Sequence, residues 1–178
     1  MSNTPFLTID YITKWYPHKD GKIHLFQSRE KRSWVKAVDD VFLTMNRGEV
    51  LGIIGESGCG KSTLGRMLVR LENPTSGDVL LDGKSTAQML RENNKAFRKR
   101  VQIVFQNPFD TFTPRDTIEK ILMRPLKNYN IGASDEERLK MCRDALESGG
   151  LHPAEEILKR YPHELSGGQL QRISIIRS

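Results

Sequence analysis

The chain has 178 residues, of which 37% are hydrophobic and 28% charged, a balance that excludes a disordered or fibrous protein. Lys and Arg number 28 against 22 Asp and Glu, and the net charge of +6 is compatible with nucleic acid, an anionic membrane surface or a phosphate-rich ligand. No stretch reaches the roughly 18 apolar residues that a membrane span needs, and the start lacks the apolar run of a secretory signal. The two cysteines, Cys59 and Cys142, are too few for a disulfide framework and are interpreted as reduced thiols.

The first half of the chain shows the pattern of an α/β fold. Alternating apolar residues predict half-buried antiparallel strands over residues 6–12 and 41–45, separated by a polar insertion over residues 17–34. The nearly continuous apolar run at residues 49–54 is typical of a strand buried on both faces, and the spacing over residues 64–71 predicts a helix soon after it. The alternation continues with a short strand at residues 79–81, a charged helical stretch ending at Arg100 and a second buried strand at residues 101–105.

Beyond residue 107 the sequence predicts helices only. They are expected over residues 117–123, 135–148 and 153–160. Ser134 and Glu137 form a capping box at the start of the second of these helices, and Gly149 with Gly150 ends it. The chain is therefore expected to divide into residues 1–106, with the strands and the first part of an α/β core, and residues 107–178, a helical subdomain.

Residues 55–62 carry the most informative motif. Their sequence, Gly-Glu-Ser-Gly-Cys-Gly-Lys-Ser, matches the phosphate-binding pattern G-x-x-x-x-G-K-[ST] and lies between a predicted strand and a predicted helix. Glycines let backbone N–H groups face phosphate oxygens, and the new helix presents its positive end to the same anion. Lys61 is expected to reach the β- and γ-phosphates, while the Ser62 hydroxyl is placed to bind Mg²⁺. The predicted nucleotide-binding residues of this segment are Gly55, Glu56, Ser57, Gly58, Cys59, Gly60, Lys61, Ser62 and Thr63.

A second motif lies near the end of the sequence, at Leu165, Ser166, Gly167, Gly168 and Gln169. Ser166 is placed to cap a helix whose third residue is Gln169, and the two glycines leave the first amides open to an anion. Alone, this turn is also compatible with a plain helix start. Its occurrence together with a phosphate loop favours a role in nucleotide binding.

Together the two motifs resemble the Walker A and signature motifs of the nucleotide-binding subunits of ATP-binding cassette (ABC) transporters. The resemblance implies a P-loop NTPase core with an N-terminal antiparallel β subdomain and an α-helical subdomain, and it implies ATP and Mg²⁺ as ligands. It gives catalytic roles to Lys61 and to Gln106, which matches the glutamine that helps to position Mg²⁺ and the attacking water. It also implies that residues 165–169 face the nucleotide of a second subunit. Tyr16 matches the aromatic residue that stacks on adenine; Trp15 is the alternative, and a plain core aromatic is the third possibility.

The residues in and around these motifs narrow the resemblance to one branch of the family, the importers of oligopeptides, dipeptides and nickel. It rests on the loop sequence, the polar insertion, Gln106-Asn107-Pro108 and the Tyr161-Pro162-His163-Glu164 lead into the second motif. The resemblance then implies an ATP-hydrolysing subunit at the cytoplasmic face of the cell membrane, with peptides or nickel as the cargo class. Its expected partners are transmembrane permease subunits and a second, identical or different, ATP-binding subunit, with no direct nucleic acid and no membrane span of its own.

The end of the sequence departs from the family. Members continue from the signature helix into a strand with an Asp and a catalytic Glu, and later a switch His, whereas this sequence stops at Ser178. The C-terminal part of the core sheet is therefore expected to be missing, and the 178 residues alone are expected to lack ATP turnover. Two alternatives stay open: a truncated nucleotide-binding remnant without hydrolysis, and a soluble ABC ATPase whose basic runs touch nucleic acid. A small-molecule P-loop kinase is disfavoured because its chemistry does not call for residues 165–169.

Overall fold

A computed structural model gives the structure of the chain, and it describes residues 4–18 and 33–178. The polar insertion expected over residues 17–34 lies largely outside these described residues. The chain divides into two compact units, Met1–Val101 and Gln102–Ser178. Each unit is described by itself below. The division into subdomains expected after residue 106 stays a prediction.

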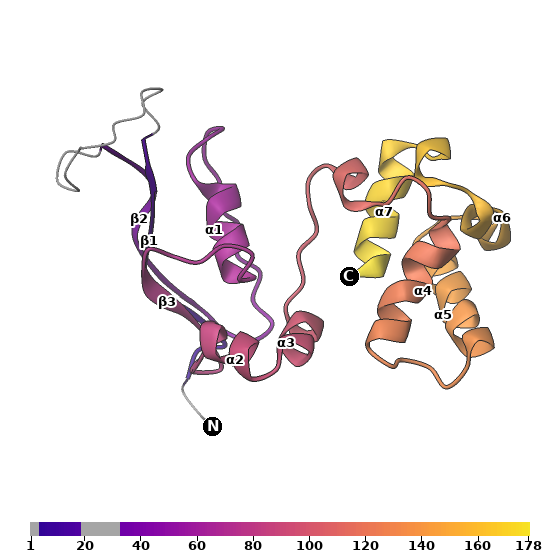
Figure 1. The fold of residues 1–178 in the computed structure, drawn as a ribbon, viewed down its shortest axis with the longest axis horizontal. Coiled ribbons are helices and arrows are strands. Elements are labelled where there is room, and N and C mark those ends of the chain that lie inside the picture. Colours follow the sequence, from indigo (N-terminus) through magenta and orange to yellow (C-terminus); the bar gives the residue numbers. More distant parts are fainter. Residues whose placement is uncertain (1–3, 19–32) are drawn as a thin grey trace, which may run out of the picture. The chain divides into compact units, whose positions relative to one another are not determined.

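The first unit is built on a four-stranded antiparallel sheet with the strand order β2-β1-β3-β4, against which α1 packs (Figure 1). Its elements are β1 (Leu7–Pro17), β2 (Trp34–Met45), α1 (Lys61–Leu68), β3 (Ser76–Leu81), β4 (Lys84–Ser85), α2 (Thr86–Glu92) and α3 (Asn94–Arg100). The strands predicted over residues 6–12, 41–45 and 79–81 are confirmed as β1, β2 and β3. Their inward residues form one small core with α1, made of Ile9, Ile12, Val38, Leu64, Met67 and Val79.

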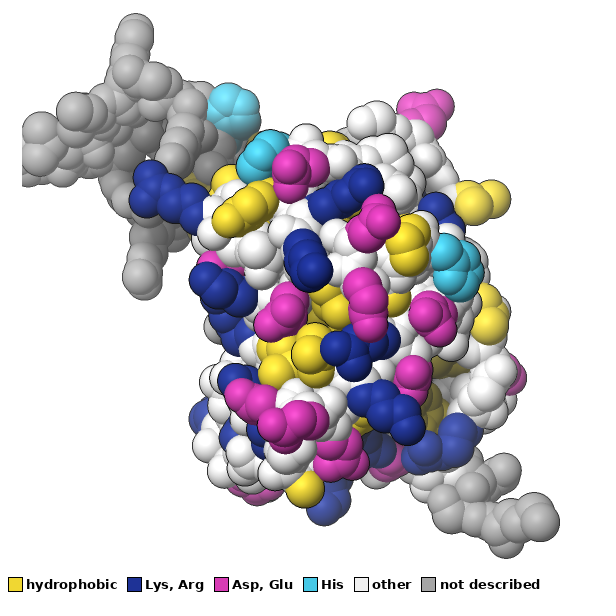
Figure 2. Space-filling model, turned by 90° about the vertical axis from the view of Figure 1, so that its right-hand side faces the viewer, with side chains coloured by type: hydrophobic (Ala, Val, Ile, Leu, Met, Phe, Trp, Pro, Cys, Tyr) yellow, Lys and Arg dark blue, Asp and Glu magenta, His cyan; other side chains and the backbone are white. Residues whose placement is uncertain are grey.

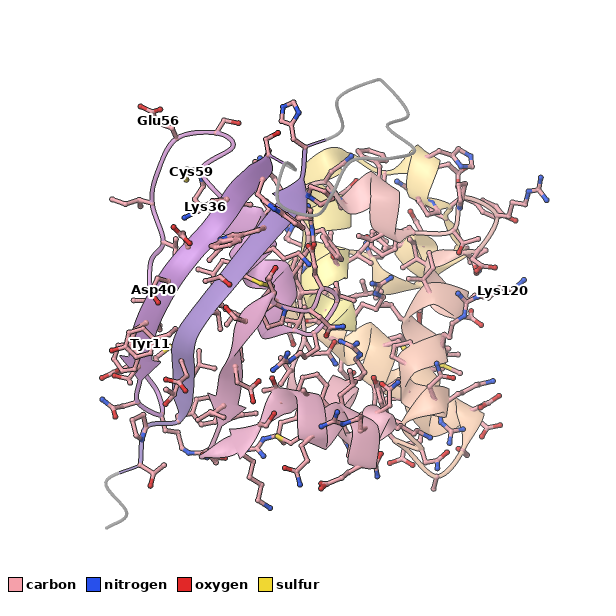
Figure 3. All side chains as sticks on the ribbon, turned by 60° about the vertical axis from the view of Figure 1, so that its left-hand side comes forward. Tyr11, Lys36, Asp40, Glu56, Cys59 and Lys120 are labelled. Carbon is pink, nitrogen blue, oxygen red and sulfur yellow. The ribbon has the colours of Figure 1, made fainter. Side chains whose placement is uncertain are left out.

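The pairing of β1 with β2 is interrupted by bulges. Register shifts flank Ile12, and the two strands carry left-handed residues near this point, Tyr11 with φ 44° and Asp40 with φ 52°. The bulge leaves the Tyr11 ring exposed, where it stacks on Phe42 with ring centroids 5.0 Å apart. Figure 3 shows Tyr11 and Asp40 beside each other on the sheet. Bulges of this kind bend a strand and raise its twist.

The predicted helix over residues 64–71 starts and ends earlier than expected, as α1. The chain leaves the helix at Arg70, which has φ 53° and a buried side chain. Arg70 pairs with Asp78 of β3 and donates from Nε to the Thr86 hydroxyl at 2.7 Å, while that hydroxyl donates to the carbonyl of Val79 at 2.9 Å. A buried charge is stable only when it is paired and hydrogen-bonded. This network therefore fixes the end of α1 against β3 and α2.

Two predicted strands do not form. Residues 49–54 and 101–105 do not form strands. Apolar side chains of the first segment are exposed, with exposed fractions of 99% for Val50 and 95% for Ile54. The prediction was wrong because hydrophobic pattern alone does not make a strand, which also needs a neighbour for its N–H and C=O groups. Among the residues that the structure describes, neither segment has such a neighbour.

The second unit is helical, as predicted. Its elements are η2 (Pro108–Thr111), α4 (Ile118–Asn128), α5 (Asp135–Ser148), α6 (Ala154–Lys159), η3 (Pro162–Glu164) and α7 (Gly167–Arg177). Buried apolar residues from all four α-helices form its core, including Ile118, Leu146, Ile157, Leu170 and Ile173. Of the helices in the described part of the chain, none is long and apolar enough to cross a bilayer.

The capping prediction for α5 is confirmed with one difference. The Ser134 hydroxyl accepts from the N–H of Glu137 at 3.2 Å, which satisfies one of the open amides at the helix start. The Glu137 carboxylate accepts from the N–H of Ala133 at 2.6 Å, one residue earlier than in a standard capping box. Such side-chain caps set the first residue of a helix, and here the predicted and observed bounds agree.

Candidate functional site

The glycine loop at residues 55–60 leads directly into α1. Gly58 and Gly60 have φ 81° and 95°, in the left-handed region that favours glycine. A Cβ atom on Gly60 would lie 2.1 Å from the carbonyl oxygen of Ala37, so the loop end runs against the backbone of β2. The loop itself is exposed, and Figure 3 shows Glu56 and Cys59 on it. Its conformation therefore depends on residues without a side chain at these two positions.

The start of α1 is open to a ligand. Gly60 is the N-cap residue and offers no side-chain hydrogen bond, and the first turn holds no acidic residue. The first amides of any helix lack intrahelical acceptors, and they carry the positive end of the helix dipole. An uncapped start next to a glycine loop is thus a binding position for an anion.

Lys61 lies inside this loop rather than in solvent. Its Nζ donates to the carbonyl oxygens of Gly55 at 2.7 Å and Glu56 at 2.6 Å, and it lies 3.5 Å from the sulfur of Cys59. The side chain therefore reaches back over the loop, so that its charge lies beside the loop carbonyls. An anion bound by the loop would meet the ammonium group there.

The remaining predicted loop residues differ in exposure. Ser57, Cys59 and Ser62 are exposed, while Thr63 is half-buried. The Ser62 hydroxyl at the helix start is an oxygen donor of the type that Mg²⁺ prefers.

Tyr16 lies on the side of β1 that faces α1. Its hydroxyl donates to the carboxylate of Glu72, which follows α1, and Lys14 forms an ion pair with the same carboxylate at 3.2 Å. Burial raises the pKa of Tyr16, and the hydrogen bond to Glu72 raises it further. The same bond, with the help of Lys14, lowers the pKa of Glu72. Glu72 was not foreseen from the sequence, because no local pattern connects residues 56 positions apart.

Trp15, the alternative adenine platform, makes different contacts. Its Nε1 donates to Asp39 at 3.0 Å, and the ammonium of Lys36 lies 4.6 Å from a Trp15 ring centroid. The ammonium of Lys14 lies 5.2 Å from the Tyr16 ring centroid. Each ring thus has a cation near one face, and the choice of Tyr16 as the adenine platform stays a prediction.

Gln106 belongs to the second unit and is exposed, in the irregular segment before η2. The residue before it is held by α7, since Gln171 donates from Nε2 to the carbonyl of Phe105 at 3.4 Å. The Oε1 atom of Gln171 is buried and has no hydrogen-bond partner among the described residues. Gln171 was missed at the sequence level, and its spacing from Gln106 gives no signal that would have found it.

The second motif forms the start of α7. Ser166 and Gln169 make a complete capping box, with the Gln169 N–H donating to Ser166 at 3.3 Å and the Ser166 N–H donating to the Gln169 side chain at 2.9 Å. Leu165 is buried and anchors the turn, while Gly167 and Gly168 are exposed. The box leaves the first amides of α7 on the surface, at the two glycines.

The family follows from comparison with known proteins. The sequence profile of the family described as ABC transporter matches residues 38–178, which is most of the chain. The chain belongs to the ABC transporter family. Its fold agrees, because the ATP-binding cassette MJ0796, solved as a dimer bound to ADP and Pi, superimposes with a TM-score of 0.79 at 31% sequence identity. That match covers 96% of this chain and 68% of the MJ0796 chain.

Two curated relatives extend this ABC family assignment. The oligopeptide transport ATP-binding protein AppF of Bacillus subtilis is 44% identical over 168 residues, 94% of this chain and 49% of the relative. The dipeptide transport ATP-binding protein DppF of Haemophilus influenzae is 43% identical over 175 residues, 98% of this chain and 51% of the relative. The chain thus spans about half the length of the curated relatives that it matches.

The ABC family binds ATP, and the loop of this chain fits a nucleotide phosphate. The uncapped α1 and the enclosed Lys61 ammonium supply donors and positive charge, and the Ser62 hydroxyl supplies an oxygen for a hard cation. Within the described residues, no cluster of His, Cys, Asp or Glu forms a metal site of its own.

Proposed function

We propose that this chain is the nucleotide-binding part of an ATP-binding subunit that energises an ABC importer for peptides. The observation that carries the proposal is the loop of residues 55–60, where an uncapped helix start and the Lys61 ammonium converge on one position. The helix start and the ammonium both supply hydrogen-bond donors and positive charge. A triphosphate fits them because it carries negative charge and many oxygen acceptors.

Lys61 is assigned to the β- and γ-phosphates, and the amides of residues 58–63 to the phosphate oxygens. The Lys61 ammonium donates to the carbonyl oxygens of Gly55 and Glu56, and phosphate oxygens are stronger acceptors for the same charged group. Ser62 and Gln106 are assigned to Mg²⁺, which neutralises phosphate charge when bound. Tyr16 is assigned to adenine, whose π-face an aromatic ring can stack on.

Residues 165–169 are assigned to the nucleotide of a second ATP-binding subunit. The open amides of Gly167 and Gly168 and the dipole of α7 suit an anion, and the capping box fixes their direction. MJ0796, which shares the fold, is dimeric in its ADP-bound and Pi-bound state. The dimer of this chain, identical or mixed, would place each signature segment opposite the partner's loop.

The peptide assignment rests on the relatives named above for oligopeptide and dipeptide transport, and it favours peptides over nickel. Such a subunit acts at the cytoplasmic face of the membrane, bound to transmembrane permease subunits. Hydrolysis is assigned to the whole protein rather than to these residues, because activating the attacking water needs a general base. Lys61, Ser62 and Gln106 do not supply one.

The face of the chain in Figure 2 does not show the concentrated positive charge that would favour an ATPase acting on nucleic acid. Lys and Arg side chains are interspersed there with Asp and Glu, instead of forming a basic stripe. Proteins that hold nucleic acid by its phosphates gather their positive charge on one surface. This face therefore gives no support to a nucleic-acid contact, and the peptide-transport relatives favour the importer.

The test compares Mg-ATP binding by the chain with binding by Lys61→Ala, using titration calorimetry. We expect the substitution to weaken binding at least tenfold, because a charge-assisted contact to the phosphates is lost. Lys95→Ala is the matched control, since Lys95 is an exposed lysine on α3. Equal affinity of Lys61→Ala and Lys95→Ala for Mg-ATP would refute the proposed site.

A further inference from the structure

The second unit contains a pocket that the proposed nucleotide site does not use. Its volume is about 230 Å³, and it lies between the segment around η2, the helix α4 and the end of α7. Apart from the Tyr129 hydroxyl, the polar side chains that line it are Gln102, Thr111, Thr113, Arg124, Asn128 and Arg177. All six can donate hydrogen bonds, and the two arginines and the amides do so from several directions.

The two arginines of this pocket have different partners. Arg124 forms an ion pair with Asp116 at 2.6 Å. Arg177 instead donates to the backbone carbonyl of Thr111 at 3.1 Å and lies 5.2 Å from the ring centroid of Phe112. Among the described residues that line the pocket there are thus two guanidinium groups and no carboxylate.

The surroundings of Arg177 destabilise its positive charge. Burial lowers the pKa of Arg177, and the nearby charge of Arg124 lowers it further. Both effects mean that the cationic form of this side chain is less stable than it would be in water. An anion between the two guanidinium groups would reverse both effects, because it restores polar contacts and compensates the repulsion.

We propose that this pocket binds a tetrahedral oxyanion of the phosphate class. A carboxylate has only two oxygens, whereas phosphate has four, which suits donors that approach from η2, α4 and α7. Guanidinium groups are the side chains that bind phosphate with two parallel hydrogen bonds. The volume suits an isolated phosphate or the phosphoryl group of a larger molecule. The residues that line the pocket all belong to the unit Gln102–Ser178, and none of them is a residue of the nucleotide loop.

The experiment titrates inorganic phosphate into Lys61→Ala by calorimetry at low ionic strength, so that the Lys61 ammonium does not contribute. We expect one phosphate site, weakened at least tenfold by adding Arg177→Gln. Arg160→Gln is the matched control, because Arg160 lies on the surface of the same unit and has only a 3.8 Å ion pair with Glu156. Its affinity for phosphate should not change.

A second variant tests the pocket independently, in case Arg177→Gln does not fold. Thr113→Val removes one exposed hydroxyl donor of the pocket, and we expect it to weaken phosphate binding about threefold while the circular dichroism spectrum is retained. A parallel titration with AMP distinguishes free phosphate from a phosphoryl group as the source. Absence of binding by both probes, or equal affinity in Arg177→Gln and Arg160→Gln, would overturn the proposal. Neither outcome bears on Mg-ATP binding at Lys61, which is tested separately.

Discussion

The Tyr16 hydroxyl donates to the carboxylate of Glu72 and so connects the end of β1 to the segment after α1. The bond lowers the pKa of Glu72 from 4.5, while burial, and after it the bond, raises the pKa of Tyr16 from 10.0. Lys14 adds an ion pair to Glu72 at 3.2 Å. The contact therefore stabilises the first unit only while Glu72 is ionised and Tyr16 is protonated.

The first prediction is that the contribution of this pair to the free energy of unfolding is constant over a middle range of pH. It falls at both the acid and the alkaline end of that range. The folded pKa of Glu72 is depressed, so its contribution is present above pH 4.5 and is lost as the pH falls through the lower folded pKa. The folded pKa of Tyr16 is raised, so its contribution is present below pH 10 and is lost as the pH rises through the higher folded pKa. Tyr16→Phe should cost about 1 kcal/mol on the plateau and flatten both flanks.

Urea unfolding between pH 3 and pH 11 measures this effect. Tyr11→Phe is the control, because the Tyr11 ring is exposed and its stacking on Phe42 survives the loss of the hydroxyl. If Tyr16→Phe shows the same pH flanks as the parent chain, the Tyr16–Glu72 bond does not set them.

The second prediction concerns the backbone of the nucleotide loop. Gly60→Ala places a Cβ atom 2.1 Å from the carbonyl of Ala37 at a φ of 95°, so the loop end must move away from β2. We expect a stability loss of about 2 kcal/mol or more and a loss of Mg-ATP binding. Gly65→Ala is the paired control, because nothing lies within 4 Å of its added Cβ atom and Ala favours the helix by about 1 kcal/mol. Gly65→Ala should therefore be neutral or stabilising in the same melts, and wild-type affinity in Gly60→Ala would contradict the loop geometry.

The helical unit could be predicted from the sequence because its signals are local. The bounds of α5 follow from Ser134 at its start and glycines at its end, and the start of α7 follows from the capping box of Ser166 with Gln169. Each of these contacts joins residues three or four apart. Local hydrogen bonds of this kind form with almost no information from the rest of the chain.

The errors arose where contacts are distant in the sequence. Residues 49–54 have a strong apolar pattern, yet they form no strand because pairing depends on a neighbour far along the chain. The end of α1 depends on the contacts of Arg70 with Asp78 and Thr86. The sequence around Arg70 contains no helix-stop signal that would predict these contacts. In the candidate site, the loop was recognisable from its motif, whereas Glu72 and its contact with Tyr16 were not.

The third prediction is that the two cysteines differ in their reactivity toward an alkylating reagent. Cys59 is exposed on the loop, while Cys142 is buried in the second unit, where burial raises its pKa to about 11 and Glu119 adds to the rise. At pH 8 only about one Cys142 thiol in a thousand is then ionised, and the thiolate is the reactive form. Iodoacetamide should modify Cys59 in the native chain and Cys142 only after unfolding in urea. Peptide mass spectrometry measures both sites, and Mg-ATP should slow the modification of Cys59 alone; equal native labelling of both cysteines would disprove the burial of Cys142.

The fourth prediction follows from the exposed apolar segment at residues 49–54. Val50 is 99% exposed and Ile54 95%, and the segment is unpaired within the described residues. Extended apolar backbone with unpaired N–H and C=O groups is a template for pairing with other chains. We expect the 178-residue chain to bind a hydrophobic dye and to elute above its monomer size at tens of micromolar, by the same physics as edge-strand association.

The variant Val50→Lys with Ile54→Lys should reduce both dye binding and association, because charges on an edge oppose pairing. Ile175→Lys provides the comparison, since Ile175 is 56% exposed but lies on the helix α7, where the backbone is already hydrogen-bonded. It should leave the elution volume unchanged. A parent chain that elutes as a monomer, melts sharply and binds little dye would show that residues 49–54 are covered in solution. In that case the double variant should destabilise the fold rather than improve its solubility, because lysines would then replace buried apolar contacts.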